Sequence, residues 1–468
     1  MAQGTPTLLK ALLREQHWQT YRRFRRGYIK VAGALDPDLA GSCPSESTFR
    51  RWLNGRIEGL PRAEPCAVLE KMFPGHTAEQ LFGPYRELTQ ADDAGTDPIP
   101  AASAVEVYGL NHQDLSRSIE TVTGLWRQDV HRRDFLQGAA TVSAAFIAPA
   151  LDFLVQPRDE TVERNSGGKR VTMADARLIR TVSDQARTID QTFGGARYRT
   201  ALLGFLDGEV SEMLNGTYSD AVGRELHAAA AEATCLLGWM AHDIGRYGLA
   251  QRYYTEALRL AQAAGDTSQG ASILSFMGYL ARDSGNHREA VQLTRAGVTR
   301  GSRATPAVQA HLHAFEAWAL VSVGDKRGVL AAIDNATRGF DRSSPSDLDL
   351  AEMTRGDLLG LFGHCYTSLG MTREGEEVVT EALVELESSP RSRSFCVLHA
   401  ANLAVQHRDA EHAAVFGVEA LELLPTLTSS RVEDELRAFV KHLNTLGGSA
   451  VIRDFTERAH DYEMARVC

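Results

Sequence analysis

The sequence has few of the features that mark a protein as secreted. It contains six cysteines in 468 residues, none of them in a Cys-x-x-Cys pair. Its first residues, MAQGTPTLLKALLREQHW, form a charged amphipathic segment without the apolar core of a secretory signal. Scattered cysteines without such a signal indicate reduced thiols. We therefore expect a cytoplasmic protein without a disulfide framework.

The motifs of the common enzyme classes are also missing. The sequence has no HExxH zinc motif, no GxSxG nucleophile, no protein-kinase set and no dinucleotide fingerprint. His311 and His313 would lie on different faces of a helix, and His407 and His412 match no standard zinc spacing. We therefore expect no enzymatic activity, no metal and no cofactor.

The charge of the chain is unevenly distributed. The net charge is −10, but the first 86 residues hold 13 Lys/Arg against 8 Asp/Glu, so they carry +5 and the remainder carries −15. A basic head on an acidic body is expected when only the head meets a polyanion, although chance clustering would give the same numbers. The length favours more than one domain, and many glycines with few prolines favour helices joined by tight turns.

Residues 1–85 predict a compact domain of five helices. Two helices are expected within 7–35, and shorter ones over 45–56, 61–73 and 76–82. In the segment SESTFRRWLNGR (45–56), Phe49, Trp52 and Leu53 share one face. That face packs inward, so the polar residues of this short helix are left outside.

Such a helix is the kind that helix-turn-helix proteins place in the major groove of DNA. FRRWLNGR, followed by LPRAEPCAVLEKMFPGHTAEQLF, resembles the recognition helix and following helices in a family of bacterial helix-turn-helix–tetratricopeptide (HTH–TPR) transcriptional regulators. The nine-residue connection before this helix, residues 36–44, is longer than the tight turn of the standard motif. The residues expected to contact phosphates or bases are Arg22, Arg23, Arg25, Arg26, Ser45, Ser47, Thr48, Arg50, Arg51, Asn54 and Arg56.

A linker over 86–103 and connecting helices over 104–155 follow the head. Within the latter, RRDFL (132–136) precedes an apolar run and resembles a twin-arginine export signal. Such signals are N-terminal, and the run is marginal for the ~20 residues that span a membrane. A buried interdomain helix is the favoured interpretation, and a membrane contact and export are the alternatives. Residues 156–171 have the composition of a second linker.

From 172 to 450 the sequence predicts repeated helical hairpins. In AAEATCLLGWMAHDIGRYGLAQRYYTEALRL (230–260), Gly238 lets two helices approach, Tyr254 fills the gap between them, and Gly245 ends the first helix with a positive φ. Turn glycines recur at 245, 285, 324 and 370, and a fifth unit is less regular. The pattern resembles the tetratricopeptide repeat (TPR), although the intervals of 40, 39 and 46 exceed its period of about 34. We expect an all-α chain with a TPR-like solenoid, followed by a helix or tail over 451–468.

Stacked hairpins form a concave groove, which the first helix of each hairpin lines. Aromatic, Arg and Asn side chains there suit an extended peptide. The predicted lining residues are Trp239, His242, Tyr279, Arg282, Trp318, His364 and Asn402. Packing between repeats is the alternative role for each of them.

These features predict a sequence-specific DNA-binding regulator. A single small head binds weakly, so a homodimer reading two half-sites is expected, with the body dimerising and sensing a ligand such as a short peptide. The resemblance to the HTH–TPR family covers most of the chain and implies the same arrangement of a DNA-binding head and a ligand-sensing body. A protein-interaction adaptor is the alternative, and an enzyme on a TPR scaffold is the least favoured one.

Overall fold

The computed structural model describes residues 7, 9–10, 13, 20–35, 39, 42–53, 61–73, 78–82, 115–131, 141–155, 162, 164, 168–346 and 354–467. The chain divides into two units, Met1–Asp97 and Pro98–Cys468. The first contains the predicted head, and we call the second the body. Both are helical. Within the described residues there are no strands, and isolated bridges join Arg164 to Tyr218 and Arg170 to Thr217. The expectation of an all-α chain is confirmed to this extent.

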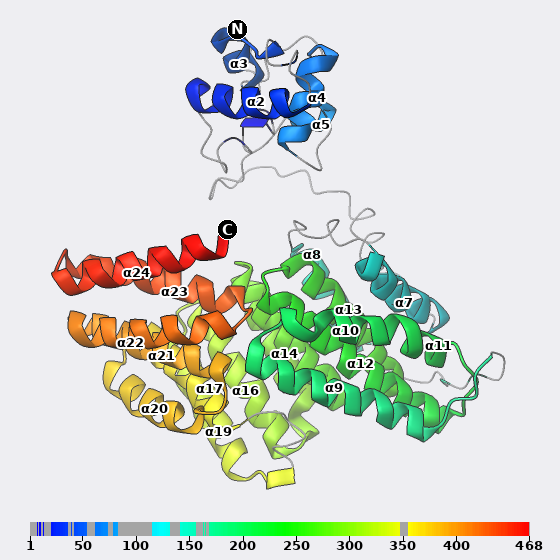
Figure 1. Cartoon of the computed structure of the whole chain (residues 1–468). Helices are drawn as coiled ribbons and strands as arrows, with labels where there is room; N and C mark the ends of the chain where they lie inside the picture. The colour runs from blue at the N-terminus through cyan, green and yellow to red at the C-terminus, as the bar shows by residue number, and fades with distance from the viewer. Residues whose placement is uncertain are drawn as a thin grey trace. The chain divides into compact units, whose positions relative to one another are not determined.

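The head places its helices around one aromatic core. Its helices are α2 (Tyr21–Leu35), α3 (Glu46–Leu53), α4 (Ala63–Met72) and α5 (Ala78–Phe82) (Figure 1). The buried side chains that join them are Leu9, Leu13, Phe24, Tyr28, Phe49, Trp52, Val68, Leu69, Met72, Phe73, Leu81 and Phe82. The second to fifth helices predicted for this unit are therefore present. Most of the predicted first helix lies outside the described residues.

The body begins with helices that precede the hairpins. These are α7 (Leu115–His131), α8 (Ala144–Val155), α9 (Met173–Phe193), α10 (Ala196–Phe205), the π-helical η2 (Leu206–Val210) and α11 (Ser211–Leu214). Of these, α7 and α8 pack against α13 (Tyr247–Ala264), and α9 packs against α12 (Asp220–Asp243).

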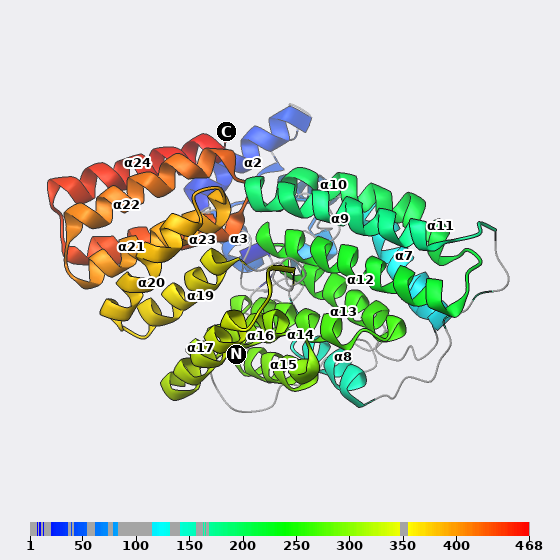
Figure 2. The ribbon, with the colours of Figure 1, turned by 90° about the horizontal axis from the view of Figure 1, so that it is seen from below.

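Six pairs of helices follow. After α12–α13 come α14 (Thr267–Asp283) and α15 (His287–Arg300), α16 (Pro306–Val321) and α17 (Lys326–Asp341), α19 (Arg355–Ser368) and α20 (Thr372–Glu385), α21 (Pro390–Gln406) and α22 (Ala410–Leu423), and α23 (Ser430–Leu443) and α24 (Ala450–Val467). The first helices of successive pairs pack side by side, and the first five pairs each form a hairpin (Figures 1 and 2). The predicted C-terminal helix exists, because 451–468 lies almost entirely in α24.

The predicted turn chemistry is confirmed. Gly245 has a φ of 75°, and Gly285, Gly324 and Gly370 have φ values of 83°, 71° and 67°. In the fifth hairpin the same position is taken by Arg408, with a φ of 61°. All five residues lie two positions before the second helix of their hairpin.

The close approach of α12 and α13 at Gly238 is also confirmed. A Cβ atom on Gly238 would lie 2.8 Å from the ring of Tyr254, which is fully buried. Only a residue without a side chain leaves room for this ring, so the glycine sets the distance between the two helices.

Two expectations about connecting segments need revision. The predicted linker over 156–171 is in part hydrogen-bonded to the body, since Val162 N donates to Asp220 (3.0 Å) and Val171 N donates to Thr217 O (2.9 Å). The apolar run after RRDFL contains α8, which packs on α13, α14 and α15 and buries Phe146 and Phe153. The apolar helix therefore belongs to the body, against whose hairpins it packs. Residues 86–103 and the RRDFL motif lie outside the described residues.

Candidate functional site

The inner face of α3 is fixed by two aromatic contacts. Phe49 stacks on Phe24 of α2 with ring centroids 4.4 Å apart, and Trp52 meets the ring of Phe82 edge-on at 5.2 Å. The Thr7 hydroxyl donates to the carbonyl of Trp52 at 2.9 Å. With one side held by these contacts, the opposite side of α3 faces outward.

That outward face carries the predicted polar residues. Arg50 and Arg51 are exposed, and Arg50 pairs with Glu46 at 2.7 Å while its side chain stays 73% accessible. Ser47 is exposed as well. The face therefore presents two guanidinium groups, a carboxylate and a hydroxyl within two helical turns, a size and chemistry that fit a DNA groove.

All three predicted hydroxyl groups have partners within α3 and its cap, and the Ser47 hydroxyl lies 3.0 Å from that of Ser45. The Ser45 hydroxyl accepts from the Thr48 backbone at 3.3 Å, as an N-cap does, and lies 2.9 Å from the Thr48 hydroxyl. Arg51 also donates to the Thr48 hydroxyl at 3.4 Å. Ser45 and Thr48 thus hold the first turn of α3 in place. Asn54 and Arg56 lie outside the described residues.

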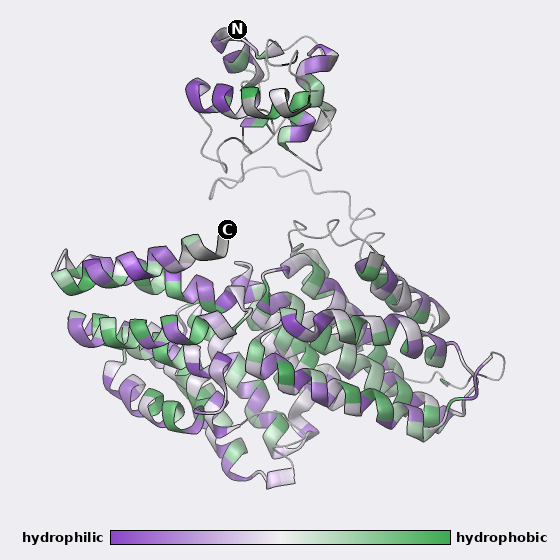
Figure 3. Ribbon diagram, viewed as in Figure 1, coloured by the Kyte–Doolittle hydropathy of each residue, from purple (hydrophilic) through white to green (hydrophobic). Residues whose placement is uncertain are grey.

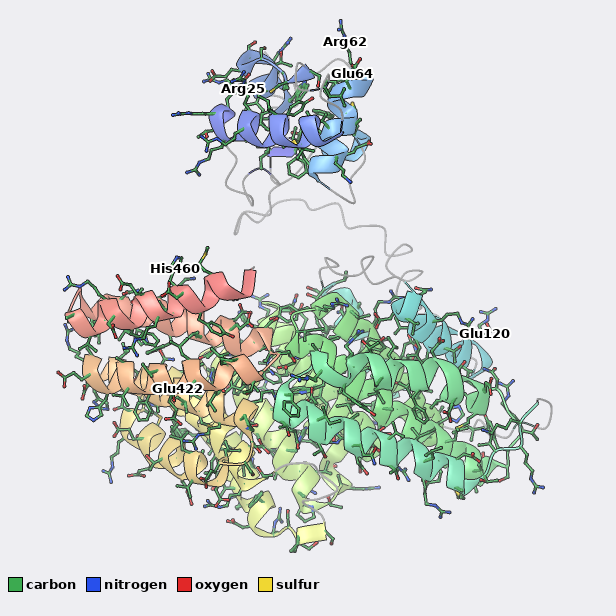
Figure 4. All side chains as sticks on the ribbon, viewed as in Figure 1. Arg25, Arg62, Glu64, Glu120, Glu422 and His460 are labelled. Atoms are coloured by element: carbon green, nitrogen blue, oxygen red, sulfur yellow. The ribbon has the colours of Figure 1, made fainter. Side chains whose placement is uncertain are left out.

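The first half of α2 is the second basic element of the head. Phe24 and Tyr28 are buried, while Arg22, Arg23, Arg25 and Arg26 are exposed. This half of the helix is strongly hydrophilic in Figure 3, and Arg25 projects from it in Figure 4. Four exposed arginines on one helix suit contacts to phosphates, which need charge more than exact placement.

In the body, the structure brings six of the seven predicted groove residues into one continuous row. Trp239 and His242 come from α12, Tyr279 and Arg282 from α14, Trp318 from α16 and His364 from α19. Ring centroids are 5.9 Å apart for Trp239–Tyr279, 5.0 Å for Tyr279–Trp318 and 3.8 Å for Trp318–His364. Arg282 lies over the Trp318 ring at 4.7 Å and donates to His364 at 2.9 Å.

The seventh residue, Asn402, makes different contacts. Its side chain accepts a hydrogen bond from His442 of α23 at 2.9 Å and donates to the Leu398 carbonyl at 3.0 Å. It therefore ties α21 to α23.

The row is largely covered. His242 is fully buried, and Tyr279 and Trp318 are only 5% and 6% exposed. Of the two roles that the sequence left open, packing between repeats describes His242. Two arginines that were not predicted, Arg391 of α21 and Arg431 of α23, lie over the Trp239 ring, and Arg431 also lies over the Tyr279 ring.

Arg391 and Arg431 meet carboxylates from the first helices of the body. Arg391 pairs with Asp190 of α9 at 2.6 Å, and Arg431 lies 3.4 Å from Asp283 of α14. Asp243, which is fully buried, lies 3.9 Å from Arg391 and 3.8 Å from Arg431. Buried ion pairs thus join helices from the two ends of the array, and α9 packs against α21.

Further hydrogen bonds join the same two regions of the body. The backbone N–H and hydroxyl of Thr428 both donate to the Phe193 carbonyl, at 2.8 and 3.0 Å. Asp243 accepts from Gly195 N at 3.0 Å and from the Ser429 hydroxyl at 2.8 Å. We call these contacts, together with Arg391 and Arg431, the closure.

The charges of the closure are set by its buried environment. Burial alone would raise the pKa of Asp283, but the hydrogen bond from His242 and the nearby Arg431 lower it below the usual range, so the carboxylate is ionised. Burial lowers the pKa of His242, and the charge of Arg431 lowers it further, although the bond to Asp283 opposes this. His242 is therefore neutral at pH 7 and donates through Nε2 to Asp283 at 3.0 Å.

Among the described residues, no group of three or more His, Cys, Asp or Glu side chains is arranged to hold a metal ion. None of the described helices combines the length and the apolar character that crossing a bilayer requires. No protein-family model matches the chain, and no curated protein matches it.

Proposed function

We propose that this protein is a sequence-specific DNA-binding transcriptional regulator. The head acts as a helix-turn-helix domain, and the body is a TPR-like solenoid that dimerises and senses a ligand of the peptide class. The outward face of α3 is the observation that carries the proposal, because Arg50, Arg51 and Ser47 stand exposed on a helix fixed by Phe49 and Trp52.

The division of charge supports the same function. The basic residues of α2 supply sequence-independent attraction to phosphates, while the side chains on α3 are of the types that read base edges. The rest of the chain carries −15 and is repelled by DNA, which orients the head toward the duplex.

The hairpins support the sensing role of the body. Stacked first helices form one continuous face for a ligand, part of which the chain's own Arg391 and Arg431 cover in this structure. Bending of the stack changes the relation between distant hairpins. A ligand that alters this bending in a dimer would change the spacing of the two heads, and with it the fit to two half-sites.

Capture of genomic fragments by the full chain tests this function. The variant Arg50→Ala with Arg51→Ala removes two exposed guanidinium groups from α3. We expect loss of sequence enrichment, at about 1–3 kcal/mol for each specific contact. The matched control is Arg327→Ala with Arg453→Ala, which removes two exposed arginines of the body and should leave enrichment unchanged.

A second variant separates phosphate contacts from base contacts. Replacing Arg22, Arg23, Arg25 and Arg26 with Ala should weaken binding to all sequences alike and reduce the salt slope by about 0.9 for each phosphate that is no longer neutralised. Absence of enrichment by the wild-type chain, with no salt-dependent binding of nucleic acid, would refute the proposal. That result would favour the adaptor alternative.

A further inference from the structure

We propose that the inner face of the body is a binding site for an arginine side chain, and that the chain's own Arg431 occupies it here. The ligand of the body is then a peptide that presents an arginine and replaces Arg431. This inference rests on the ligand-sensing role proposed above and names the chemical class of the ligand.

Three aromatic rings surround the guanidinium group of Arg431. Its Cζ atom lies 4.6 Å from the ring centroid of Tyr279, 5.2 Å from that of Trp239 and 5.1 Å from that of Phe395. These rings come from α14, α12 and α21, so the site is built from three separate hairpins. A cation enclosed by aromatic faces is attracted by their quadrupoles, and a planar guanidinium can also stack on them. We call the three rings, with Asp243 and Asp283, the cage.

The polar side of the cage matches the shape of a guanidinium group. Arg431 Nε lies 3.4 Å from Asp283 Oδ2, Nη1 lies 3.8 Å from Asp243 Oδ1, and Nη2 donates to the Tyr279 hydroxyl. Three nitrogens on different edges of one plane thus each have an oxygen partner. An ammonium group is a compact point charge and cannot reach three such partners at once. The cage therefore selects arginine over lysine.

The occupant and two of the three rings of the cage belong to distant parts of the chain. Arg431 follows Tyr279 by 152 residues and lies in the first turn of α23. The short 3₁₀ helix η4 (Leu424–Thr426) and an irregular stretch precede that turn. Trp239 and Tyr279, by contrast, belong to the first two hairpins. The side chain thus reaches the cage from the far end of the array, as a ligand would.

The neighbouring Arg391 stays in place when Arg431 leaves. It has its own carboxylate, Asp190, at 2.6 Å, and its Cζ lies 5.3 Å from the ring of Trp239. Exchange of Arg431 for a ligand arginine keeps the number of buried charges constant, so no carboxylate of the cage is left without a cation. Leaving a buried charge unpaired is the costly alternative.

Chemical rescue of the full-length chain tests the cage. Arg431→Ala empties it, and we expect the thermal unfolding midpoint to fall by roughly 5 °C or more. Methylguanidinium should restore part of this loss, whereas methylammonium at the same concentration should not. The control variant Arg327→Ala, which removes an exposed arginine, should show no rescue. If Arg431→Ala does not fold, Arg431→Gln provides the same comparison.

A second measurement tests replacement of Arg431 in the wild-type chain. Hydrogen exchange in α23 is followed with capped tetra-arginine and capped tetra-lysine peptides. We expect tetra-arginine alone to speed exchange in α23. Equal rescue by both small cations, or unchanged exchange with tetra-arginine, would overturn the inference. Neither measurement involves DNA, so failure here is distinct from failure of the fragment capture that tests the head.

Discussion

The turn between α21 and α22 has a side chain where the four preceding turns have glycine. Arg408 has a φ of 61°, and its N–H donates to the Val405 carbonyl at 2.9 Å. The next N–H, of Asp409, donates to the Ala404 carbonyl at 2.9 Å. Gly370 and its successor make the same two bonds, at 3.1 and 2.9 Å. The backbone thus closes each turn in the same way, and the residue type is the difference.

Replacing Arg408 with Gly should therefore stabilise the body. The left-handed conformation costs a residue with a Cβ about 1–2 kcal/mol, while a glycine costs about 0.5–1 kcal/mol through the greater freedom of the unfolded chain. Since the Arg408 side chain is exposed, little packing is lost. The net expectation is a gain of about 0.5–1 kcal/mol, measured by urea unfolding of the full chain followed by circular dichroism.

Two Gly→Ala substitutions provide the matched comparison. A Cβ on Gly285, with a φ of 83°, would meet no atom within 4 Å, so only backbone strain acts there and stability should fall by about 1 kcal/mol. A Cβ on Gly124 of α7 is equally unobstructed but in ordinary helical backbone, so Gly124→Ala should stabilise by about 0.5–1 kcal/mol. A loss of stability in Arg408→Gly, or the same sign for both alanine variants, would refute the reasoning.

Three further predictions concern the interior of the body. Gly238→Ala should cost about 1–3 kcal/mol in urea unfolding, because its Cβ would lie 2.8 Å from the Tyr254 ring, and a native-like midpoint would contradict the close approach described above. Burial lowers the pKa of His227, His311 and His399 to about 4, so below pH 6.5 the unfolded chain binds more protons than the folded chain. The free energy of unfolding should therefore fall by about 2 kcal/mol for each histidine as the pH is lowered from 7 to 5. Unfolding that does not depend on pH over this interval would show that these histidines are not buried as neutral groups. Arg391→Leu should cost about 3–5 kcal/mol because Asp190 is left buried without its cation; adding Asp190→Leu should recover much of the loss, and failure to do so would show that the pair does not act as a unit.

Local features of the fold could be predicted from the sequence. Helical periods located α2, α3 and the hairpins, and the glycines at 245, 285, 324 and 370 located the turns, because both signals depend on neighbours in the chain. The equivalent turn at Arg408 was not found, since no residue type marks it. Residues 156–171 have the composition of a linker, and composition does not reveal the hydrogen bonds that Val162 and Val171 make to the body.

The closure could not be predicted, because it depends on the curvature of the whole array. Counting from the conventional small position of each repeat predicts that Trp239, Tyr279 and Trp318 share one face, and the structure has them in one row. Whether that row is open depends on α23, which reaches it from a distant part of the chain. The only local signal for Arg391 and Arg431 is a charged residue in the first turn of a helix, next to Pro390 and Ser430. Such residues are common and usually solvated.

The closure also limits how the length of this protein can change over evolutionary time. In an open array each hairpin touches only its neighbours, so gene duplication can add a copy without harm to the others. Here Asp190 and Arg391 are 201 residues apart in sequence and must still meet. A hairpin inserted between them would shift Arg391 by one repeat, and each of the two charges would then be buried without its partner. Descendants of this gene should therefore vary in their loops and termini and keep the same number of hairpins between these two residues.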